Sequence, residues 1–427
     1  MIQEVEKGVL CGEVLVPSSK SDAQRAILAA ALAKGKSRIC HIGFGDDVKA
    51  MLNCIKVIGA EVSLKEGYID VIGANYFPAK ASFDCGESGL TFRLLSAICC
   101  LHKGEYTLNG SGSILTRSHK FIDDFALKYG IKIKSNSSKL PYLISGGLDP
   151  SLVSIEADGS MTSQFISGLL MGIPLLGTGL LLHAKDLRSL PYVKMTLKTM
   201  KHFGIHVDVD RDIDFTISKD ANYKPAIYAV EKDWSAASYW IAAGAIGHQV
   251  SLKGLSSSTV QADVGMLAVI QLIGGGALFK EDCLHVHSPE PGSFRFDATD
   301  CPDLFPALVC LALFCNGLSK IKGVHRLLNK ESDRAKVLLS QFEKIGGEIY
   351  IDGDEMCIEG LRPLHFAEVS SHGDHRIAMC LAITALQIEG GLSIDGASAV
   401  SKSYPEFWED LEKLRVKKNG AKAPFNS

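Results

Sequence analysis

Apolar positions along the chain gather in six segments that are hydrophobic on nearly every side. Such a pattern predicts helices that are buried all round rather than helices lying on a surface. Each segment follows an extended stretch and a short junction of small polar residues, and the whole arrangement recurs with a period of roughly 70 residues. The six predicted buried helices span residues 24–33, 90–101, 163–175, 236–246, 303–314 and 375–386.

A second helix, charged on one face only, is predicted after each of the first five buried helices. These helices span residues 47–58, 121–129, 193–203, 263–273 and 335–345, and the sixth unit ends with a helix over 407–414. A glycine follows each of the first five, as Gly59 and Gly346 do, and supplies the left-handed residue that ends a helix. Alternating strand pairs come next, such as 61–64 with 68–72 and 348–351 with 356–358.

Six β-α-β-α-β-β units indicate an α/β protein with two similar domains of three units each. A chain of 427 residues also exceeds the roughly 250–300 residues at which one hydrophobic core stops growing. We expect the C-terminal-half domain to contain residues 1–18, including the first strand, together with 232–415. The N-terminal-half domain is expected at 19–231, and the polar tail at 416–427 is expected to be disordered.

Composition narrows the class of protein. With 46% hydrophobic and 22% charged residues the chain is typical of a soluble globular protein, and a net charge of −3 argues against binding to nucleic acid or to an acidic membrane. The longest apolar stretch, 168–182, contains Pro174 and is too short to span a membrane. None of the 12 cysteines forms a C-x-x-C pair, and many lie within apolar runs, which favours core thiols in a reducing cytoplasm.

Polar side chains cluster at the junctions before the buried helices. The free N–H groups of a first helical turn favour anions, and Lys20, Ser21 and Arg25 add donors on one helix face. A capped helix or a surface ion pair is the simpler explanation for any one junction, but the recurrence predicts a cleft for anions. The other junctions are Gly86-Glu87-Ser88-Gly89 with Arg93, Thr162-Ser163-Gln164, Asp300-Cys301-Pro302-Asp303 and His372-Gly373-Asp374-His375-Arg376.

Taken in order with Lys330-Glu331-Ser332-Asp333-Arg334, these motifs resemble the enolpyruvyl transferases, and among them the 5-enolpyruvylshikimate-3-phosphate synthases. The resemblance runs from Gly12 to about Leu414. It implies two domains, each with buried parallel helices wrapped by sheets in an inside-out α/β barrel, that close over the substrates. It also implies an enzyme of the shikimate pathway that transfers the enolpyruvyl group of phosphoenolpyruvate to the 5-hydroxyl of shikimate 3-phosphate and releases phosphate.

The resemblance assigns roles residue by residue. Asp303 resembles the base on the attacking hydroxyl, Glu331 the group that moves the proton at the methylene carbon, and Lys20 the lysine that touches both substrates. The residues implied for shikimate 3-phosphate are Lys20, Ser21, Arg25, Thr162, Ser163, Gln164, Ser189, Tyr192, Asp303 and Lys330. Those implied for phosphoenolpyruvate are Lys20, Gly89, Arg117, Gln164, Arg334, Arg376 and Lys402.

A few positions depart from the common family pattern. Glu87 and Leu90 stand where many members have asparagine and threonine, and Arg326 stands where an amide commonly meets the shikimate phosphate. Arg326 could still bind that phosphate but is not assigned to it. The sequence carries no signal for a metal, nucleotide or flavin, so we expect no cofactor and no partners beyond the two small substrates, and we expect a monomer.

Three other classes of function stay open. The related transferase that acts on UDP-N-acetylglucosamine has an asparagine where this chain has Ser21, and a reactive cysteine in the loop that here spans 110–117 without one. Another transferase of the same fold with a smaller acceptor is a second alternative. A non-catalytic anion-binding scaffold is the third, although it is disfavoured because Asp303 and Glu331 are both present. A P-loop kinase is disfavoured because the G-x-x-x-x-G-K-[ST] motif is absent.

Overall fold

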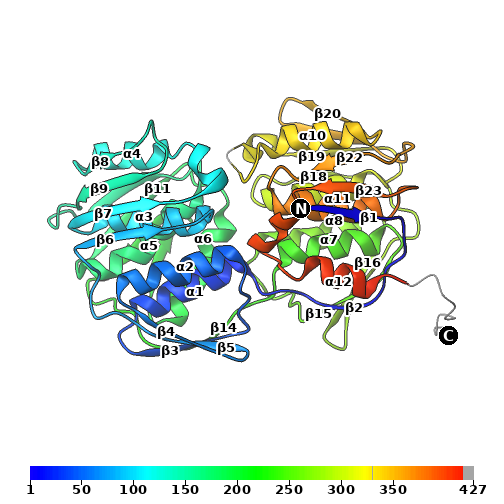
Figure 1. Cartoon of the computed structure of the whole chain (residues 1–427). Coiled ribbons are helices and arrows are strands. Elements are labelled where there is room, and N and C mark those ends of the chain that lie inside the picture. The colour runs from blue at the N-terminus through cyan, green and yellow to red at the C-terminus, as the bar shows by residue number, and fades with distance from the viewer. Residues whose placement is uncertain (329, 417–427) are drawn as a thin grey trace.

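The chain forms two α/β bodies that lie side by side, as Figure 1 shows. This computed structural model describes residues 1–328 and 330–416, so the tail predicted to be disordered lies, from residue 417 on, outside the described residues. The chain passes between the bodies near Ser18 and again near Lys232, and these two residues pair in a short antiparallel bridge.

The repeating unit has a fixed strand order. In the unit built around α3 (Gly89–Leu101), β6 (Lys80–Asp84) runs parallel to β7 (Gly104–Asn109). Antiparallel pairing then joins β7 to β9 (Tyr142–Gly146) and β9 to β8 (Lys132–Lys134). The same order recurs in the sheets β14-β3-β5-β4, β10-β11-β13-β12, β2-β15-β17-β16 and β18-β19-β21-β20. The β-α-β-α-β-β repeat predicted from the sequence is therefore present in the described chain.

The remaining elements of the N-terminal half follow the same plan. Its strands are β3 (Lys36–Cys40), β4 (Glu61–Lys65), β5 (Tyr68–Ile72), β10 (Ser154–Asp158), β11 (Leu180–Lys185), β12 (Val207–Asp210), β13 (Asp214–Ile217) and β14 (Ile227–Ala229). Its helices are α1 (Lys20–Leu32), α2 (Asp46–Ile58), α4 (Lys120–Lys128), α5 (Ser163–Gly172) and α6 (Leu190–His202), with 3-10 turns η1 (Gly112–Thr116) and η2 (Ile173–Leu176).

The C-terminal half repeats this plan with the first two strands of the chain added. Its strands are β1 (Ile2–Val5), β2 (Cys11–Leu15), β15 (Gln249–Lys253), β16 (Gly276–Lys280), β17 (Cys283–His287), β18 (Arg295–Asp297), β19 (Leu318–Lys322), β20 (Glu348–Asp352), β21 (Glu355–Glu359), β22 (Glu368–Ser370) and β23 (Leu392–Asp395). Its helices are α7 (Trp234–Ala245), α8 (Met266–Leu272), α9 (Phe305–Ala312), α10 (Arg334–Lys344), α11 (His375–Ala385) and α12 (Phe407–Leu414), with 3-10 turns η3 (Ala262–Gly265), η4 (Pro302–Leu304), η5 (Val324–Leu327) and η6 (Ala397–Lys402).

Three strands pair with strands that lie far from them in the sequence. β1 pairs with β23, β2 pairs in parallel with β15, and β14 pairs in parallel with β3. The buried residues likewise form two separate hydrophobic cores, one drawn from residues 23–230 and one from residues 5–16 together with 234–414. On this basis we propose the domain limits expected from the sequence, 19–231 for one domain and 1–18 with 232–415 for the other.

All six predicted buried helices are present, and their ends differ from the prediction for local reasons. α1 begins at Lys20 rather than residue 24, because the Ser19 side chain accepts a hydrogen bond from the Asp22 N–H and draws the polar junction into the first turn. α5 ends at Gly172, where Pro174 cannot continue the helix and a 3-10 turn follows. The buried helix predicted at 303–314 divides into η4 and α9. The half-exposed helix predicted at 263–273 likewise divides into η3 and α8.

The glycines predicted to end the half-exposed helices adopt left-handed backbone conformations. Their φ angles are 104° at Gly59, 67° at Gly130, 85° at Gly204, 79° at Gly274 and 91° at Gly346. Cysteines of the apolar runs, such as Cys99 and Cys310, are buried and free, as predicted for core thiols. Among the described residues no helix is long and apolar enough to cross a membrane.

Two glycines let α3 and α5 approach closely at the centre of the N-terminal core. A Cβ atom on Gly168 would lie 2.7 Å from the Ala97 Cβ and 2.7 Å from the Leu94 carbonyl oxygen, and one on Gly172 would lie 2.8 Å from the Leu101 Cδ1. These distances are far shorter than a normal van der Waals contact. Glycine is therefore required for this helix pair.

We expect Gly168→Ala to destabilise the protein even though alanine is the better helix former. The helix-propensity gain is about 1 kcal/mol, whereas overpacking a closed core costs about 1–3 kcal/mol and strains both helices. Urea unfolding followed by circular dichroism would measure the difference. Gly292→Ala is the matched control, since the atom nearest to a Cβ added there would lie 3.9 Å away. A Gly168→Ala protein at least as stable as the parent would contradict the close packing.

Candidate active site

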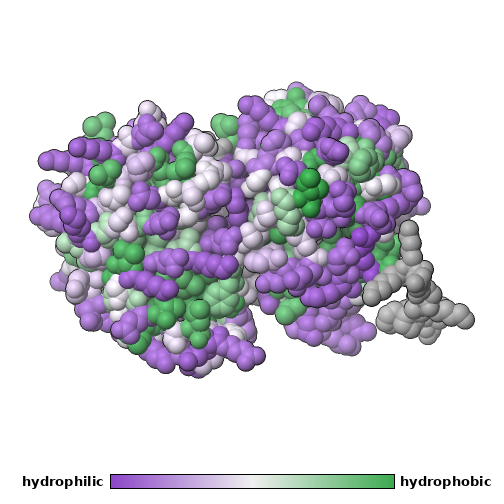
Figure 2. All heavy atoms as spheres, viewed as in Figure 1, coloured by the Kyte–Doolittle hydropathy of each residue, from purple (hydrophilic) through white to green (hydrophobic). Residues whose placement is uncertain are grey.

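A cavity of about 210 Å³ lies between the two domains. Figure 2 shows mainly hydrophilic residues along the groove that separates them on the viewed face. The cavity wall combines residues from the starts of α1, α3, α5 and α6 with residues from η4, η5 and the start of α11. The junctions predicted to meet therefore line one cavity, and both halves of the chain build it.

Side-chain caps fix the helix ends that face the cavity. Ser88 accepts from the Thr91 N–H at the start of α3, Thr162 from the Gln164 N–H at α5, and Asp374 from the Arg376 N–H at α11. A cap leaves the other N–H groups of the first turn available, and the helix dipole makes that end attractive to anions. Caps formed by the local sequence thus aim several helix ends into one space.

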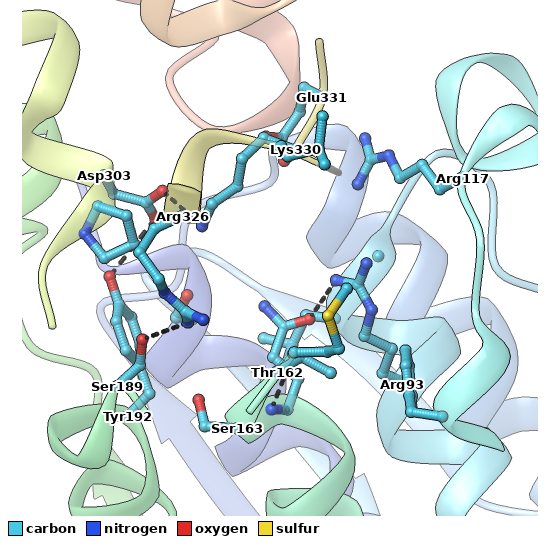
Figure 3. Close-up of a pocket in the computed structure, with 18 of the residues that line it drawn as sticks. Arg93, Arg117, Thr162, Ser163, Ser189, Tyr192, Asp303, Arg326, Lys330 and Glu331 are labelled. Carbon is cyan, nitrogen blue, oxygen red and sulfur yellow. Dashed lines mark hydrogen bonds and ion pairs between the residues drawn. The ribbon is translucent and has the colours of Figure 1, made fainter. Parts of the chain in front are cut away.

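Arginines and hydroxyl groups line the N-terminal side of the cavity. Arg93 donates to the Gln164 Oε1 at 2.7 Å, and Arg117 donates to the Ser113 Oγ at 2.8 Å. Figure 3 shows Arg117 to the right of Lys330 and Glu331, and Arg93 below Arg117 at about the height of Thr162. Burial, with the nearby charge of Arg117, lowers the pKa of Arg93 to about 9. A bound anion would relieve this unfavourable crowding of cations.

A carboxylate and several cations form the C-terminal side. Asp303 accepts from Arg334 Nη1 at 2.8 Å and from Arg376 Nη2 at 2.9 Å, and its Oδ1 lies 3.5 Å from Lys330 Nζ. The Tyr192 hydroxyl, from the other domain, donates to Asp303 at 3.4 Å. Asp303 is therefore held in one orientation by three cations and one hydroxyl.

Glu331 is the second carboxylate of the cavity. Its Oε2 lies 2.6 Å from Arg334 Nη2, and Arg334 is fixed from behind by Asp374 at 2.8 Å. Burial alone would raise the pKa values of Glu331 and Asp303. Arg334 and Arg117 outweigh burial at Glu331, as Arg376 and Lys330 do at Asp303, and both pKa values lie well below their usual range. Both carboxylates are therefore ionised as long as no other anion binds to these cations.

Lys20 connects the two sides of the cavity. Its Nζ forms an ion pair with Asp47 Oδ2 at 2.9 Å, and its backbone N–H donates to Asp233 Oδ2 of the other domain at 3.1 Å. Burial opposes its charge, but Asp47 and Glu331 more than compensate, so the pKa of Lys20 is raised. Lys20 therefore stays charged inside the cavity.

Most of the residues predicted for the site line this one cavity. They are Lys20, Ser21, Gly89, Arg117, Thr162, Ser163, Gln164, Ser189, Tyr192, Asp303, Lys330, Glu331 and Arg376. Three others lie off its wall. Arg25 is fully buried and donates to Thr196, the Ser21 carbonyl and the Tyr192 carbonyl; Arg334 lies behind the carboxylates; Lys402 contacts Glu87 and the Gly373 carbonyl.

The structure adds three residues that the sequence analysis did not assign to the site. Arg93 was part of a quoted motif, and its position one turn after Gly89 was the available signal. Asp47 gave no such signal, because it meets Lys20 only through the packing of α2 against α1. Arg326 reaches from η5 across the cavity, donating to the Ser160 carbonyl at 2.8 Å and to the Ser189 Oγ at 3.0 Å (Figure 3). Its side chain therefore stands where the serine hydroxyls gather.

Within the described residues, no group of three or more histidine, cysteine, aspartate and glutamate side chains is arranged to hold a metal ion. The expectation that the protein needs no cofactor stays a prediction.

Solved structures share the fold of this chain. An EPSP synthase from Acinetobacter baumannii superposes with a TM-score of 0.78 at 23% identity, covering 97% of this chain and 98% of that one. The enolpyruvyl transferase NikO from Streptomyces tendae superposes with a TM-score of 0.74 at 16% identity, covering 97% of each chain. The two-domain α/β fold is that of the enolpyruvyl transferases, as the sequence resemblance implied.

Sequence comparison then identifies the family. The family model for EPSP synthase (3-phosphoshikimate 1-carboxyvinyltransferase) matches residues 5–411. A 3-phosphoshikimate 1-carboxyvinyltransferase from Clostridium kluyveri is 33% identical over 94% of this chain and 95% of its own length. The protein of that name from Clostridium acetobutylicum is 34% identical over 95% of both. The chain belongs to the EPSP synthase family.

Proposed function

We propose that the chain transfers the enolpyruvyl group of phosphoenolpyruvate to the 5-hydroxyl of shikimate 3-phosphate and releases phosphate. The observation that carries this proposal is the pair of ionised carboxylates, Asp303 and Glu331, set among cations and helix N-termini from both domains. Both substrates carry a phosphate and a carboxylate, so a site for them needs this excess of positive charge. Membership of the EPSP synthase family supports the same reaction.

The reaction requires one acid–base exchange in each of two steps. In the first, the 5-hydroxyl oxygen bonds to C2 of phosphoenolpyruvate, the hydroxyl proton leaves, and the methylene carbon gains a proton, which gives a ketal phosphate. In the second, the new methyl group loses a proton and the C2–O bond to phosphate breaks, which gives the enol ether. We assign the hydroxyl proton to Asp303 and the carbon-bound proton to Glu331.

Substrate binding itself would activate these carboxylates. Arg376 and Arg334 are bound to Asp303 in the structure, and we assign both to the phosphoenolpyruvate carboxylate. When that carboxylate takes a share of the two guanidinium groups, less positive charge faces Asp303. The pKa of Asp303 then rises toward the range in which it accepts a proton. A site with substrate bound is thus more basic than the free site.

The other assignments follow the lining of the cavity. We place the shikimate 3-phosphate against Lys20, Ser21, Thr162, Ser163, Gln164, Ser189, Tyr192 and Lys330, with Arg25 holding Ser21 and Tyr192 from beneath. We place phosphoenolpyruvate against Lys20, Gly89, Arg117, Gln164 and Arg376, with Arg334 and Lys402 reaching it from behind the wall. The helix starts at Gly89 and Ser163 face the two phosphates in this arrangement.

Arg326 adds a cation to the shikimate phosphate in this proposal. It contacts Ser189 from the opposite domain, so binding there would also draw the two domains together. Arg326→Met should raise the KM for shikimate 3-phosphate by about 10- to 50-fold, the loss of one charged hydrogen-bond donor, and leave the KM for phosphoenolpyruvate nearly unchanged. Steady-state kinetics with each substrate varied would measure both. Arg295→Met, an exposed arginine on β18, is the control, and equal losses for both substrates would rule out this role.

Phosphate release tests the proposed reaction directly. The purified chain would receive phosphoenolpyruvate with shikimate 3-phosphate in one reaction and with UDP-N-acetylglucosamine in another, without added metal. Release with shikimate 3-phosphate alone is the expected result. Release only with the sugar nucleotide would mean that Ser21 and the cysteine-free loop mislead, and release with neither would favour another acceptor or a binding role.

We further propose that the chain acts as a monomer in a reducing cytoplasm. The free state of its cysteines supports the compartment, and a site completed within one chain supports the monomer. Sedimentation with and without both substrates would test the oligomeric state.

A further inference from the structure

One ion pair close to the cavity joins the two domains, and it pairs Lys402, which the proposed reaction uses, with Glu87, which it does not. Lys402 Nζ, on η6 of the C-terminal half, lies 2.8 Å from Glu87 Oε2, in the junction before α3 of the N-terminal half. The same Nζ donates to the Gly373 carbonyl at 2.8 Å. The lysine side chain is 13% exposed and that of the glutamate 35%. The pair is therefore more enclosed than an ordinary surface salt bridge.

The surroundings of this pair are shaped to hold the glutamate carboxylate. A Cβ atom on Gly112 would lie 2.2 Å from the Glu87 Cδ, so the glutamate side chain fills the space beside this glycine, and the Ser113 N–H donates to Glu87 Oε2 at 3.4 Å. Ser113 in turn accepts from Arg117 through its Oγ. On the other side, a Cβ on Gly45 would lie 2.9 Å from the Lys402 carbonyl oxygen. The two domains fit tightly around this contact.

Glu87 forms an ion pair with Lys402, a cation that the proposed reaction needs. Lys402 and Arg117 are assigned to the phosphate of phosphoenolpyruvate, and Glu87 contacts the first directly and the second through Ser113. A carboxylate and a phosphate compete for the same ammonium group, and each repels the other. An amide at position 87 would carry no such charge.

We propose that Glu87 is a specificity-determining residue that lowers the affinity of this site for phosphate-bearing ligands by acting as the built-in counter-anion of Lys402. The proposal rests on the proposed function for the identity of the phosphate it opposes. Glu87 touches neither substrate in this arrangement and acts through Lys402. Its charge sets how tightly phosphoenolpyruvate and inorganic phosphate are held, and the charge does not take part in the proton transfers.

The test is the neutral variant Glu87→Gln, which keeps the length of the side chain and its hydrogen bond to Ser113. The KM for phosphoenolpyruvate and the inhibition constant of inorganic phosphate should both fall by roughly three- to tenfold, the effect of removing one like charge near an ion pair. The kcat and the KM for shikimate 3-phosphate should change by less than about twofold. This split between KM and kcat would not follow from a loss of packing.

Asp46→Asn is the matched control, because Asp46 is the other carboxylate that bridges the domains here, through Ser401 Oγ at 2.6 Å, yet it does not contact Lys402. The Asp46→Asn variant should change the KM for phosphoenolpyruvate and the inhibition constant of inorganic phosphate by less than about twofold. An equal fall in the Asp46→Asn variant would overturn the proposal, since a general change in charge would then explain the effect. An unchanged or raised KM for phosphoenolpyruvate in Glu87→Gln would overturn it as well.

Two further measurements keep the outcome clear. Glu87→Asn serves as a second neutral variant if Glu87→Gln folds poorly, with thermal unfolding as the check. Calorimetric binding of inorganic phosphate to the parent chain and to either variant requires no turnover. A chain inactive with shikimate 3-phosphate would refute the proposed function, while tighter phosphate binding by the neutral variant would still support the role of Glu87, and equal binding would refute it.

Discussion

Replacing Glu331 with glutamine is expected to lower turnover by about 10²–10⁴-fold, the range measured for positioned acids and bases. Glutamine keeps the shape of the side chain and can still accept a hydrogen bond from Arg334, which lies 2.6 Å from the carboxylate. It cannot take up or release the proton that must move at the methylene carbon. The loss should therefore appear in kcat, with much smaller changes in the KM of either substrate.

The environment of Glu331 explains why no neighbour can replace it. Asp303 is held by Arg334, Arg376 and Lys330 and faces the hydroxyl in our arrangement. The charge of Arg334 lowers the pKa of Glu331 most, and Arg117 and Lys20 lower it further; substrate anions would neutralise part of this positive charge. Its pKa then rises on binding, which suits a group that gives and takes a proton in successive steps.

Exchange of the methylene hydrogens in heavy water measures this role separately from product formation. Glu331→Gln should slow exchange into phosphoenolpyruvate in parallel with turnover, while calorimetry should show shikimate 3-phosphate binding nearly as before. Glu343→Gln, an exposed glutamate on α10, is the control for the amide substitution. Turnover near that of the parent, or slow turnover with normal exchange, would remove Glu331 from this role.

Replacing Arg376 with glutamine should weaken phosphoenolpyruvate far more than shikimate 3-phosphate. Removing one guanidinium that makes paired, charge-assisted hydrogen bonds in a buried site costs about 3–5 kcal/mol, which corresponds to roughly 10²–10⁴-fold in KM. Arg376 is only 6% exposed and its pKa is raised, mainly by Asp303 against the cost of burial, so its charge is permanent.

Measuring the binding of each substrate separately shows whether Arg376 binds the phosphoenolpyruvate carboxylate or whether its loss only changes the overall charge of the site. Calorimetry should show shikimate 3-phosphate binding to Arg376→Gln within about threefold of the parent, since long-range charge effects near a solvated cleft are small. Arg362→Gln, which removes an exposed partner of Glu348, should change neither substrate. Equal losses for the two substrates would contradict the assignment of Arg376 to phosphoenolpyruvate.

Much of the fold follows from local patterns in the sequence. The apolar runs predict all six buried helices, and the glycines after the half-exposed helices adopt the left-handed conformation expected of them. The errors lie at helix ends, as at α1 and α5, where a cap or a proline moves the boundary by a few residues. The closing strands are harder to predict, because β14 pairs with β3 across almost two hundred residues and carries only a three-residue pattern.

The candidate site divides in the same way. The sequence marks Lys20, Gly89, Thr162 and Arg376 because each stands within a turn of a helix start, and all four line the cavity. The partners of these residues carry no local mark. Asp47 meets Lys20 only through packing, and a sequence pattern cannot show that Arg25 is buried under Tyr192 while Ser21 faces the cavity.

By itself, then, the sequence determined the repeat, the buried helices and the polar helix starts, because periodicity and capping depend on residues three or four apart. The tertiary structure alone decided which charges meet. Arg334 and Arg376 reach Asp303 from 31 and 73 positions away, and Lys402 reaches Glu87 from 315 positions away. Such contacts arise when two separately packed cores bring their helix ends together, and the energy of an ion pair depends on that distance and burial rather than on position in the chain.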